Sequence, residues 1–141
     1  MTSIEDRLAI SDLLTRYATA LDSRDWDLLR TVFVEDAQVR YAGGPLLNGF
    51  EETWRFCDRA LSRYRATQHL LGNADIHVSG DAGTSTVYLQ AIHIQPDGVI
   101  FTLGGAYYDK LVRTVDGWRI AERTLESWWT EWGDVDGAVR P

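Results

Sequence analysis

The sequence is poor in cysteine, and Cys57 is the only thiol among its 141 residues. A single cysteine excludes a disulfide within the chain and leaves no set of thiolates for a structural zinc site. A chain that needs no disulfide suits a reducing compartment, so we expect a cytoplasmic protein.

The chain also lacks a basic block and an apolar run of about 20 residues that could cross a bilayer, and no signal peptide is expected. Its 14 Lys and Arg stand against 21 Asp and Glu, for a net charge of -7. Nucleic acids and anionic membranes bind concentrated positive charge, so neither is an expected partner. The first residues, Met1 to Asp6, show no basic segment followed by an apolar one. These absences favour a soluble protein.

Two kinds of site are missing as well. Gly43-Gly44-Pro45 is followed by no Lys-Ser/Thr pair, which excludes a phosphate-binding glycine loop. His77 and His93 lack the short spacing of recognised metal ligands, and no cluster of carboxylates accompanies them. We therefore expect no metal ion.

The length of the chain fits one domain spanning residues 1–141. The hydrophobic fraction of 45%, with six Trp and four Phe, is that of a globular protein with aromatic residues left over to line a cavity.

The first half of the sequence predicts three helices. Ser3 can cap a first helix whose apolar residues recur at three- and four-residue spacing as far as Leu21. Asp25 can cap a second, short helix that runs through Phe33. A third helix is predicted from Phe50 to about Tyr64.

Strand-forming residues dominate the second half. We expect hairpins at Asp97-Gly98 and Asp116-Gly117, and strands at Gln38–Tyr41, Thr67–Leu71, Ile76–Val78, Thr84–Gln95, Val99–Val115 and Trp118–Leu125. Helices followed by hairpin-connected strands predict an α+β domain with the helices on one face of the sheet. Because Gly104-Gly105 lies within a long strand, the sheet should bend and enclose a pocket with the helices.

The segment Thr67 to Asn73 places His69 in an otherwise uncharged run. Imidazoles change charge near neutral pH, so this side chain is a candidate general base or acid. The alternative is a structural histidine that only completes a hydrogen bond in the sheet. Function is favoured by candidate partners elsewhere in the chain, namely Asp22, Tyr17, Tyr41, His93 and Arg123.

Each partner also has a structural interpretation. Asp22 can cap the second helix, and the two tyrosines can be ordinary core residues. His93 can face solvent from a strand of mixed polarity. Arg123 can pair with Glu122 or Glu126, although pairing with Asp22 inside the pocket is equally allowed.

Further aromatic residues are expected to line the pocket and to favour a cyclic or aromatic substrate: Trp54, Phe56, Tyr108, Trp128 and Trp132. The segment Ser127 to Gly133 carries three of the six Trp residues. Such a cluster covers an apolar cavity or packs into a neighbouring subunit. The third alternative, loosely attached aromatic residues at the surface, is the least favoured.

Three separated segments are similar to one family: Ala20 to Asp27, the Thr67-Gln68-His69 run with Gly72-Asn73 after it, and Asp116 to Ile120. They resemble the SnoaL-like branch of the nuclear transport factor 2-like superfamily, in the right order and over nearly the whole chain. The resemblance implies a cone-like α+β domain, in which a strongly bent antiparallel or mixed sheet and three N-terminal helices enclose a pocket. That scaffold hosts dehydratases, isomerases, cyclases and binding proteins without activity.

Within the superfamily, the chain resembles scytalone dehydratase, bile acid 7α-dehydratase and hexachlorocyclohexane dehydrochlorinase, which are lyases without a cofactor. The resemblance implies that Asp22 pairs with a catalytic His69 and that Tyr41 polarises a substrate carbonyl. It further implies catalytic roles for Tyr17, His93 and Arg123. No cofactor is therefore expected.

One departure from scytalone dehydratase bears on the substrate. Near Ala106 and Tyr108 the chain lacks the small polar residues that contact substrate in that enzyme. Scytalone itself is therefore not the expected substrate.

The resemblance implies a lyase that eliminates water or another small leaving group from a cyclic or aromatic small molecule by general base catalysis. Two alternatives stay open. One is an isomerase or cyclase of steroid-like or polyketide-like substrates, and the other is a non-catalytic binding protein or accessory subunit of a dioxygenase. Because relatives form dimers or trimers, a homodimer or homotrimer is expected.

Overall fold

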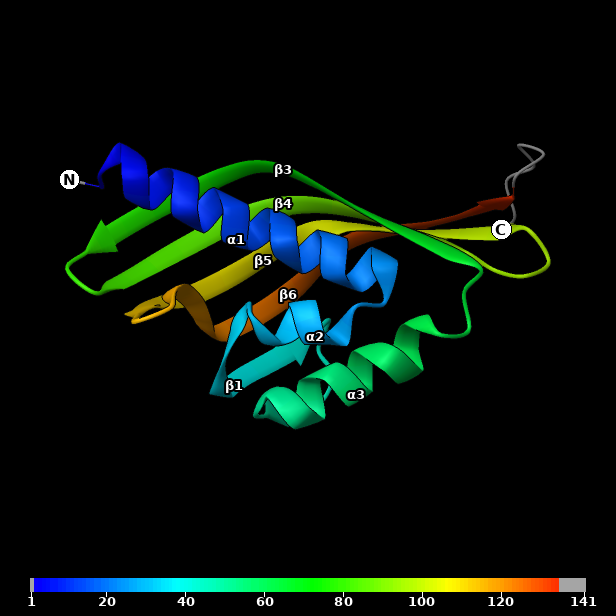
Figure 1. Ribbon diagram of the computed structural model, residues 1–141. Helices are drawn as coiled ribbons and strands as arrows, with labels where there is room; N and C mark the ends of the chain where they lie inside the picture. Colours follow the sequence, from blue (N-terminus) through cyan, green and yellow to red (C-terminus); the bar gives the residue numbers. More distant parts are fainter. Residues whose placement is uncertain (1, 135–141) are drawn as a thin grey trace.

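The computed structural model describes residues 2–134 and shows a strongly curved six-stranded sheet with helices packed against it (Figure 1). The helices are α1 (Ile4–Ser23), α2 (Trp26–Arg30) and α3 (Phe50–Leu61). The strands are β1 (Phe33–Tyr41), β2 (Leu47–Asn48), β3 (Ala66–Ser79), β4 (Ala82–Ile94), β5 (Val99–Thr114) and β6 (Gly117–Asp134). The α+β class is confirmed.

The sheet has the order β2-β1-β6-β5-β4-β3. β1 runs parallel to β6, and the other neighbours are antiparallel, so the sheet is mixed. α1 lies across the sheet, while α2 and α3 lie near β1 (Figure 1). The long hairpins β3–β4 and β4–β5 bring residues far apart in sequence onto one inner face.

α1 begins and ends with clear local signals. Its cap is Ser3, whose side chain accepts a hydrogen bond from the amide of Asp6 at 3.1 Å. The helix ends at Ser23, and the next residue, Arg24, caps it in the left-handed conformation with φ of 57°. The apolar stripe between these ends is buried against the sheet, and Tyr17 within it is fully buried.

Two predicted helix ends were wrong. α2 stops at Arg30 because Phe33 already belongs to β1, where it pairs with Ile120 of β6. Hydrogen bonding with a strand that is distant in sequence therefore determines where α2 ends, although the local apolar residues have helical spacing. α3 stops at Leu61 rather than near Tyr64.

The strand predictions also differ from the structure: β1 begins at Phe33 rather than Gln38, and the short β2 was not predicted. Thr67–Leu71 and Ile76–Val78 are parts of one strand, β3, which continues through a register shift between Leu71 and Ala74. β6 continues past Leu125 to Asp134 and carries the Trp-rich segment into the sheet, paired with β5.

The expected bend is present where β5 and β6 shift register between Gly104 and Gly105. Gly105 pairs with Ser127 and Gly104 with Trp129, so Trp128 is an extra residue in β6. A Cβ at Gly105 would lie 2.0 Å from the carbonyl oxygen of Glu126, so only glycine permits this close approach. None of the helices between residues 2 and 134 is long and apolar enough to cross a bilayer.

Candidate functional site

A cavity of about 120 Å³ lies between the helices and the inner face of the sheet. Its walls are largely aliphatic, with leucines from α1, α3 and three strands of the sheet: Leu21, Leu61, Leu89, Leu103 and Leu125. Its polar groups are Tyr17, Tyr41, Cys57, His69, His93 and Tyr107. An apolar cavity of about 150 Å³ accommodates benzene, so this one has the size for a single small ring.

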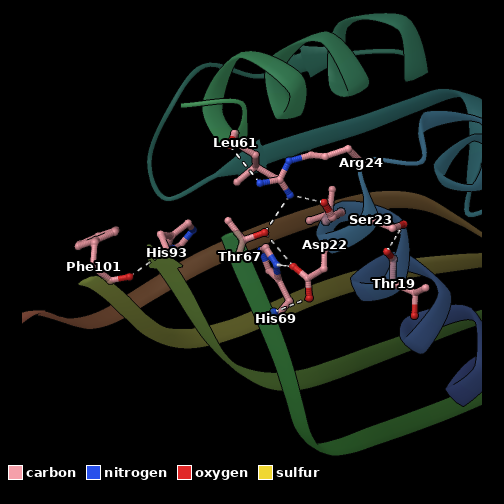
Figure 2. Close-up of polar contacts among 10 residues, drawn as sticks. Thr19, Asp22, Ser23, Arg24, Leu61, Thr67, His69, His93 and Phe101 are labelled. Atoms are coloured by element: carbon pink, nitrogen blue, oxygen red, sulfur yellow. Dashed lines mark hydrogen bonds and ion pairs between the residues drawn. The ribbon is translucent and has the colours of Figure 1, made fainter. Parts of the chain in front are cut away.

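Asp22 and His69 meet at the edge of this cavity. The Nδ1 atom of His69 lies 2.7 Å from Oδ1 of Asp22, and the backbone amide of His69 donates to Oδ2 at 2.8 Å. Thr67 donates its hydroxyl hydrogen to Oδ1 at 3.0 Å. Figure 2 shows the carboxylate at the end of α1 facing both residues of β3.

These contacts decide the ionisation of Asp22. Burial alone would raise the pKa of the carboxyl, but the hydrogen bonds from His69 and Thr67 outweigh it and leave the pKa below its usual value. An ionised carboxylate only accepts hydrogen bonds, so it holds the hydrogen of a neutral His69 ring on Nδ1. The Nε2 atom makes no hydrogen bond with any residue from 2 to 134, and the ring is 5% exposed.

His93 lies beside His69 and faces the cavity rather than solvent. The two ring centres are 6.0 Å apart, and His93 Nδ1 donates to the carbonyl oxygen of Phe101 at 3.1 Å. Burial lowers the pKa of His93, and the neighbouring His69 lowers it further against the effect of the Phe101 carbonyl. At neutral pH His93 is therefore an uncharged ring whose Nε2 can accept a hydrogen bond.

Two phenols and a thiol form a second polar group of the cavity. The hydroxyl oxygens of Tyr17 and Tyr41 are 2.9 Å apart, and Cys57 Sγ donates to the Tyr41 oxygen at 3.5 Å. Burial raises the pKa of both tyrosines well above the usual value, so both remain protonated donors. Burial also raises the pKa of Cys57 to about 11, which leaves it a neutral thiol.

Arg123 lies behind these phenols and does not line the cavity. Its guanidinium lies 4.2 Å from the ring centre of Tyr17 and 4.0 Å from that of Tyr107, and it pairs with Asp109 at 2.7 and 2.8 Å. Burial would lower the pKa of Arg123, but the carboxylate of Asp109 outweighs this effect and raises it. The expected pairing of Arg123 with Glu122, Glu126 or Asp22 was therefore wrong.

Of the aromatic residues expected at the pocket, only Phe56 lines it, where it stacks on Tyr41 with ring centres 5.5 Å apart. Trp54 lies on another face of α3, where it packs on Trp26 and donates to Glu51. Tyr108 points away from the cavity because successive side chains of a strand alternate between faces, and its neighbour Tyr107 points in.

The two tryptophans of β6 also lie outside the cavity. Trp128 is the extra residue of the bulge, and it packs against Tyr88 with ring centres 4.9 Å apart. Trp132 packs on Phe101 and is 41% exposed. The prediction that these two side chains line the cavity was therefore wrong.

Tyr107 and Asp109 were not predicted as residues of the site. Both lie on the inner face of β5, and Asp109 also accepts a hydrogen bond from the hydroxyl of Ser85 at 3.0 Å. The two-residue alternation that runs from Leu103 through Tyr107 to Asp109 could have indicated both positions. Within residues 2–134, no three His, Cys, Asp or Glu side chains converge as metal ligands would.

Comparison with known sequences finds close counterparts. The SnoaL-like domain pattern matches residues 2–124 of this chain. An uncharacterised protein of Mycobacterium tuberculosis is 33% identical over 126 residues, which span 87% of this chain and 86% of that protein.

Solved structures share the fold. A Novosphingobium aromaticivorans protein provisionally assigned as an aromatic ring hydroxylase has 28% identity and a TM-score of 0.86 over 96% of each chain. Another from that organism, provisionally assigned as a scytalone dehydratase, has 25% identity and a TM-score of 0.85 over 96% of this chain and 93% of its own. A hexachlorocyclohexane dehydrochlorinase, at 20% identity, shares the fold with a TM-score of 0.84 over 99% of each chain. With its sequence pattern matched over residues 2–124, the chain belongs to the SnoaL-like domain family.

Proposed function

We propose that the protein is a lyase that eliminates water, or another small leaving group, from a single-ring substrate with a carbonyl group. The observation that carries this proposal is the Asp22–His69 pair, joined at 2.7 Å at the edge of a cavity with phenol donors. The provisional assignment of one structural relative as a scytalone dehydratase agrees with it.

His69 is the proposed base. Its Nε2 lone pair takes a proton from the carbon next to the substrate carbonyl, and the electron pair of the C–H bond moves toward the carbonyl oxygen. Asp22 holds the Nδ1 hydrogen and stabilises the imidazolium that forms, as carboxylates do in other His-Asp pairs. A positioned base of this kind contributes roughly 10²–10⁴-fold in rate.

The phenols stabilise the negative charge that develops on the substrate oxygen. The Tyr41 oxygen can accept from both Tyr17 and Cys57, which leaves its own hydrogen for the substrate. Arg123 acts indirectly. Its positive charge lies against the rings of Tyr17 and Tyr107 and makes the hydroxyl groups of these two residues stronger donors. A donor of this type contributes about 3 kcal/mol in a dry site.

The leaving group departs with the proton that His69 has taken. The electron pair returns from the oxygen, the carbon–carbon double bond forms, and the carbon–oxygen bond to the leaving hydroxyl breaks. His69 gives its proton to that hydroxyl, and water leaves. An uncharged His93 orients the leaving group by accepting its hydrogen bond at Nε2. Arg123 does not line the cavity and takes no direct part in this step.

A mass measurement on a panel of single-ring β-hydroxy ketones tests this function. Wild-type protein should yield products lighter than the substrate by one water, and His69→Gln should lose roughly 10²–10⁴-fold of that rate. Products of unchanged mass would indicate an isomerase, because double-bond migration needs the same base and donors but no leaving group.

The non-catalytic alternative rests on another relative, the N. aromaticivorans protein provisionally assigned as an aromatic ring hydroxylase. An accessory subunit would copurify with an iron-containing partner, and its function would survive His69→Ala. The lyase requires the opposite result for that variant.

A further inference from the structure

Arg24 connects three elements of the fold beside the candidate base. It follows α1 in a left-handed conformation, with φ of 57°, and this turns its side chain back across the helix end. The guanidinium donates to the carbonyl oxygen of Leu21 in α1, to that of Leu61 in α3 at 3.1 Å, and to Thr67 Oγ1 in β3 at 2.8 Å. Figure 2 shows Arg24 between α3 and the start of β3.

The contact with Thr67 fixes the direction of its hydroxyl hydrogen. Arginine has donors only, so Thr67 Oγ1 must accept from Arg24. The hydroxyl hydrogen then points to Asp22 Oδ1 at 3.0 Å, where it joins the two donors from His69. Without Arg24, the hydroxyl could rotate and accept from other groups.

We infer that Arg24 is a positioning residue, which holds Asp22 in place for His69 by fixing the Thr67 hydroxyl as a donor. The pair that it positions is the base of the proposed function, but the inference concerns the resting protein. It therefore stands or falls independently of whether elimination is the reaction.

The positive charge of Arg24 also acts directly on the Asp22 carboxylate. The test must therefore separate this electrostatic effect from the effect through the Thr67 hydroxyl. The charged and titratable groups near the pair come from every element packed around it. Asp22 belongs to α1 and Arg24 directly follows it, Asp58 and Arg63 belong to α3 and the segment after it, His69 to β3 and His93 to β4.

Two NMR signals report on the resting protein. The carbon-13 shift of the Asp22 carboxyl gives its titration midpoint, and the ring nitrogen-15 shifts of His69 give the fraction of each neutral tautomer. The variants are Arg24→Gly, which suits the left-handed turn, Thr67→Val, which keeps the shape without the hydroxyl, and their combination. Arg16→Met is the matched control, because Arg16 is an arginine of α1 that likewise donates to a threonine, Thr31.

Arg24→Gly and Thr67→Val should each raise the Asp22 midpoint by roughly one pH unit and give His69 a mixture of tautomers. Since both act on one hydroxyl, the combined variant should shift the midpoint by clearly less than the sum of the two. Thr67→Ser and Arg16→Met should keep the wild-type signals. A combined shift equal to the sum, or a single tautomer retained in Arg24→Gly, would overturn the inference.

Discussion

The hydroxyl oxygens of Tyr17 and Tyr41 lie 2.9 Å apart, and both side chains line the cavity. Only one of the two can donate to the other. Because Cys57 also donates to the Tyr41 oxygen, the consistent arrangement is a chain of donors that leaves the Tyr41 hydrogen for a ligand.

Tyr41→Phe should therefore lower the turnover of the proposed reaction by roughly 10²-fold, the usual cost of one lost donor to a developing oxyanion. Steady-state kinetics on the substrate found in the mass assay measures the effect. Tyr88→Phe is the control, since Tyr88 is 44% exposed and packs on Trp128 away from the cavity. Activity of Tyr41→Phe within twofold of wild type would exclude this donor role.

Stability should depend on the ionisation of Asp22. The pKa of this carboxyl is lower in the folded protein than its usual value, so the stabilisation is present above about pH 4 and is lost as the pH falls through the folded pKa. Urea unfolding at several values between pH 6 and pH 3 should show a falling free energy of unfolding. Asp22→Asn should make the free energy of unfolding depend less on pH in this range. The same pH dependence in the variant and in wild type would contradict the lowered pKa of Asp22.

Asp109 should matter mainly because of the charge it neutralises. Asp109→Asn leaves the fully buried guanidinium of Arg123 without its counterion, so we expect a loss of about 3–5 kcal/mol of stability. Asp81→Asn is the control: its pair with Arg113 is exposed and should contribute little to stability. Chemical denaturation measures both, and equal losses for the two variants would refute the distinction.

Cys57 should be unreactive in the folded protein. Burial raises the pKa of its thiol to about 11, and the thiolate is the form that reacts. Iodoacetamide at pH 8 should label the native protein far more slowly than protein unfolded in urea, as followed by intact mass. Equal labelling rates in the two states would show that the cavity opens readily to solvent.

Local signals were enough to predict some elements. Ser3 and the helical spacing after it located α1, and Asp97-Gly98 located the β4–β5 hairpin, because capping and turn chemistry depend on neighbours in sequence. The end of α2 could not be predicted in this way. It depends on the pairing of Phe33 with Ile120, which no local pattern reports.

The inward or outward direction of side chains was harder to predict. β6 contains two extra residues, Ala121 and Trp128, and each shifts the alternation of its side chains by one position, so a simple count along the strand fails between them. Asp22 and His69 were paired through the family resemblance, and the structure brings them together, although their catalytic roles stay a prediction. The expected homodimer or homotrimer also stays a prediction.

The central claim is that His69, held by Asp22, removes a proton from carbon inside the cavity. Hydrogen–deuterium exchange at the α-carbon of a small cyclic ketone such as cyclohexanone in D₂O tests this step directly, without knowledge of the leaving group. Wild-type protein should accelerate exchange, and His69→Gln should reduce that acceleration roughly 10²–10⁴-fold. Exchange that is the same with wild type, with His69→Gln and without protein would contradict the claim.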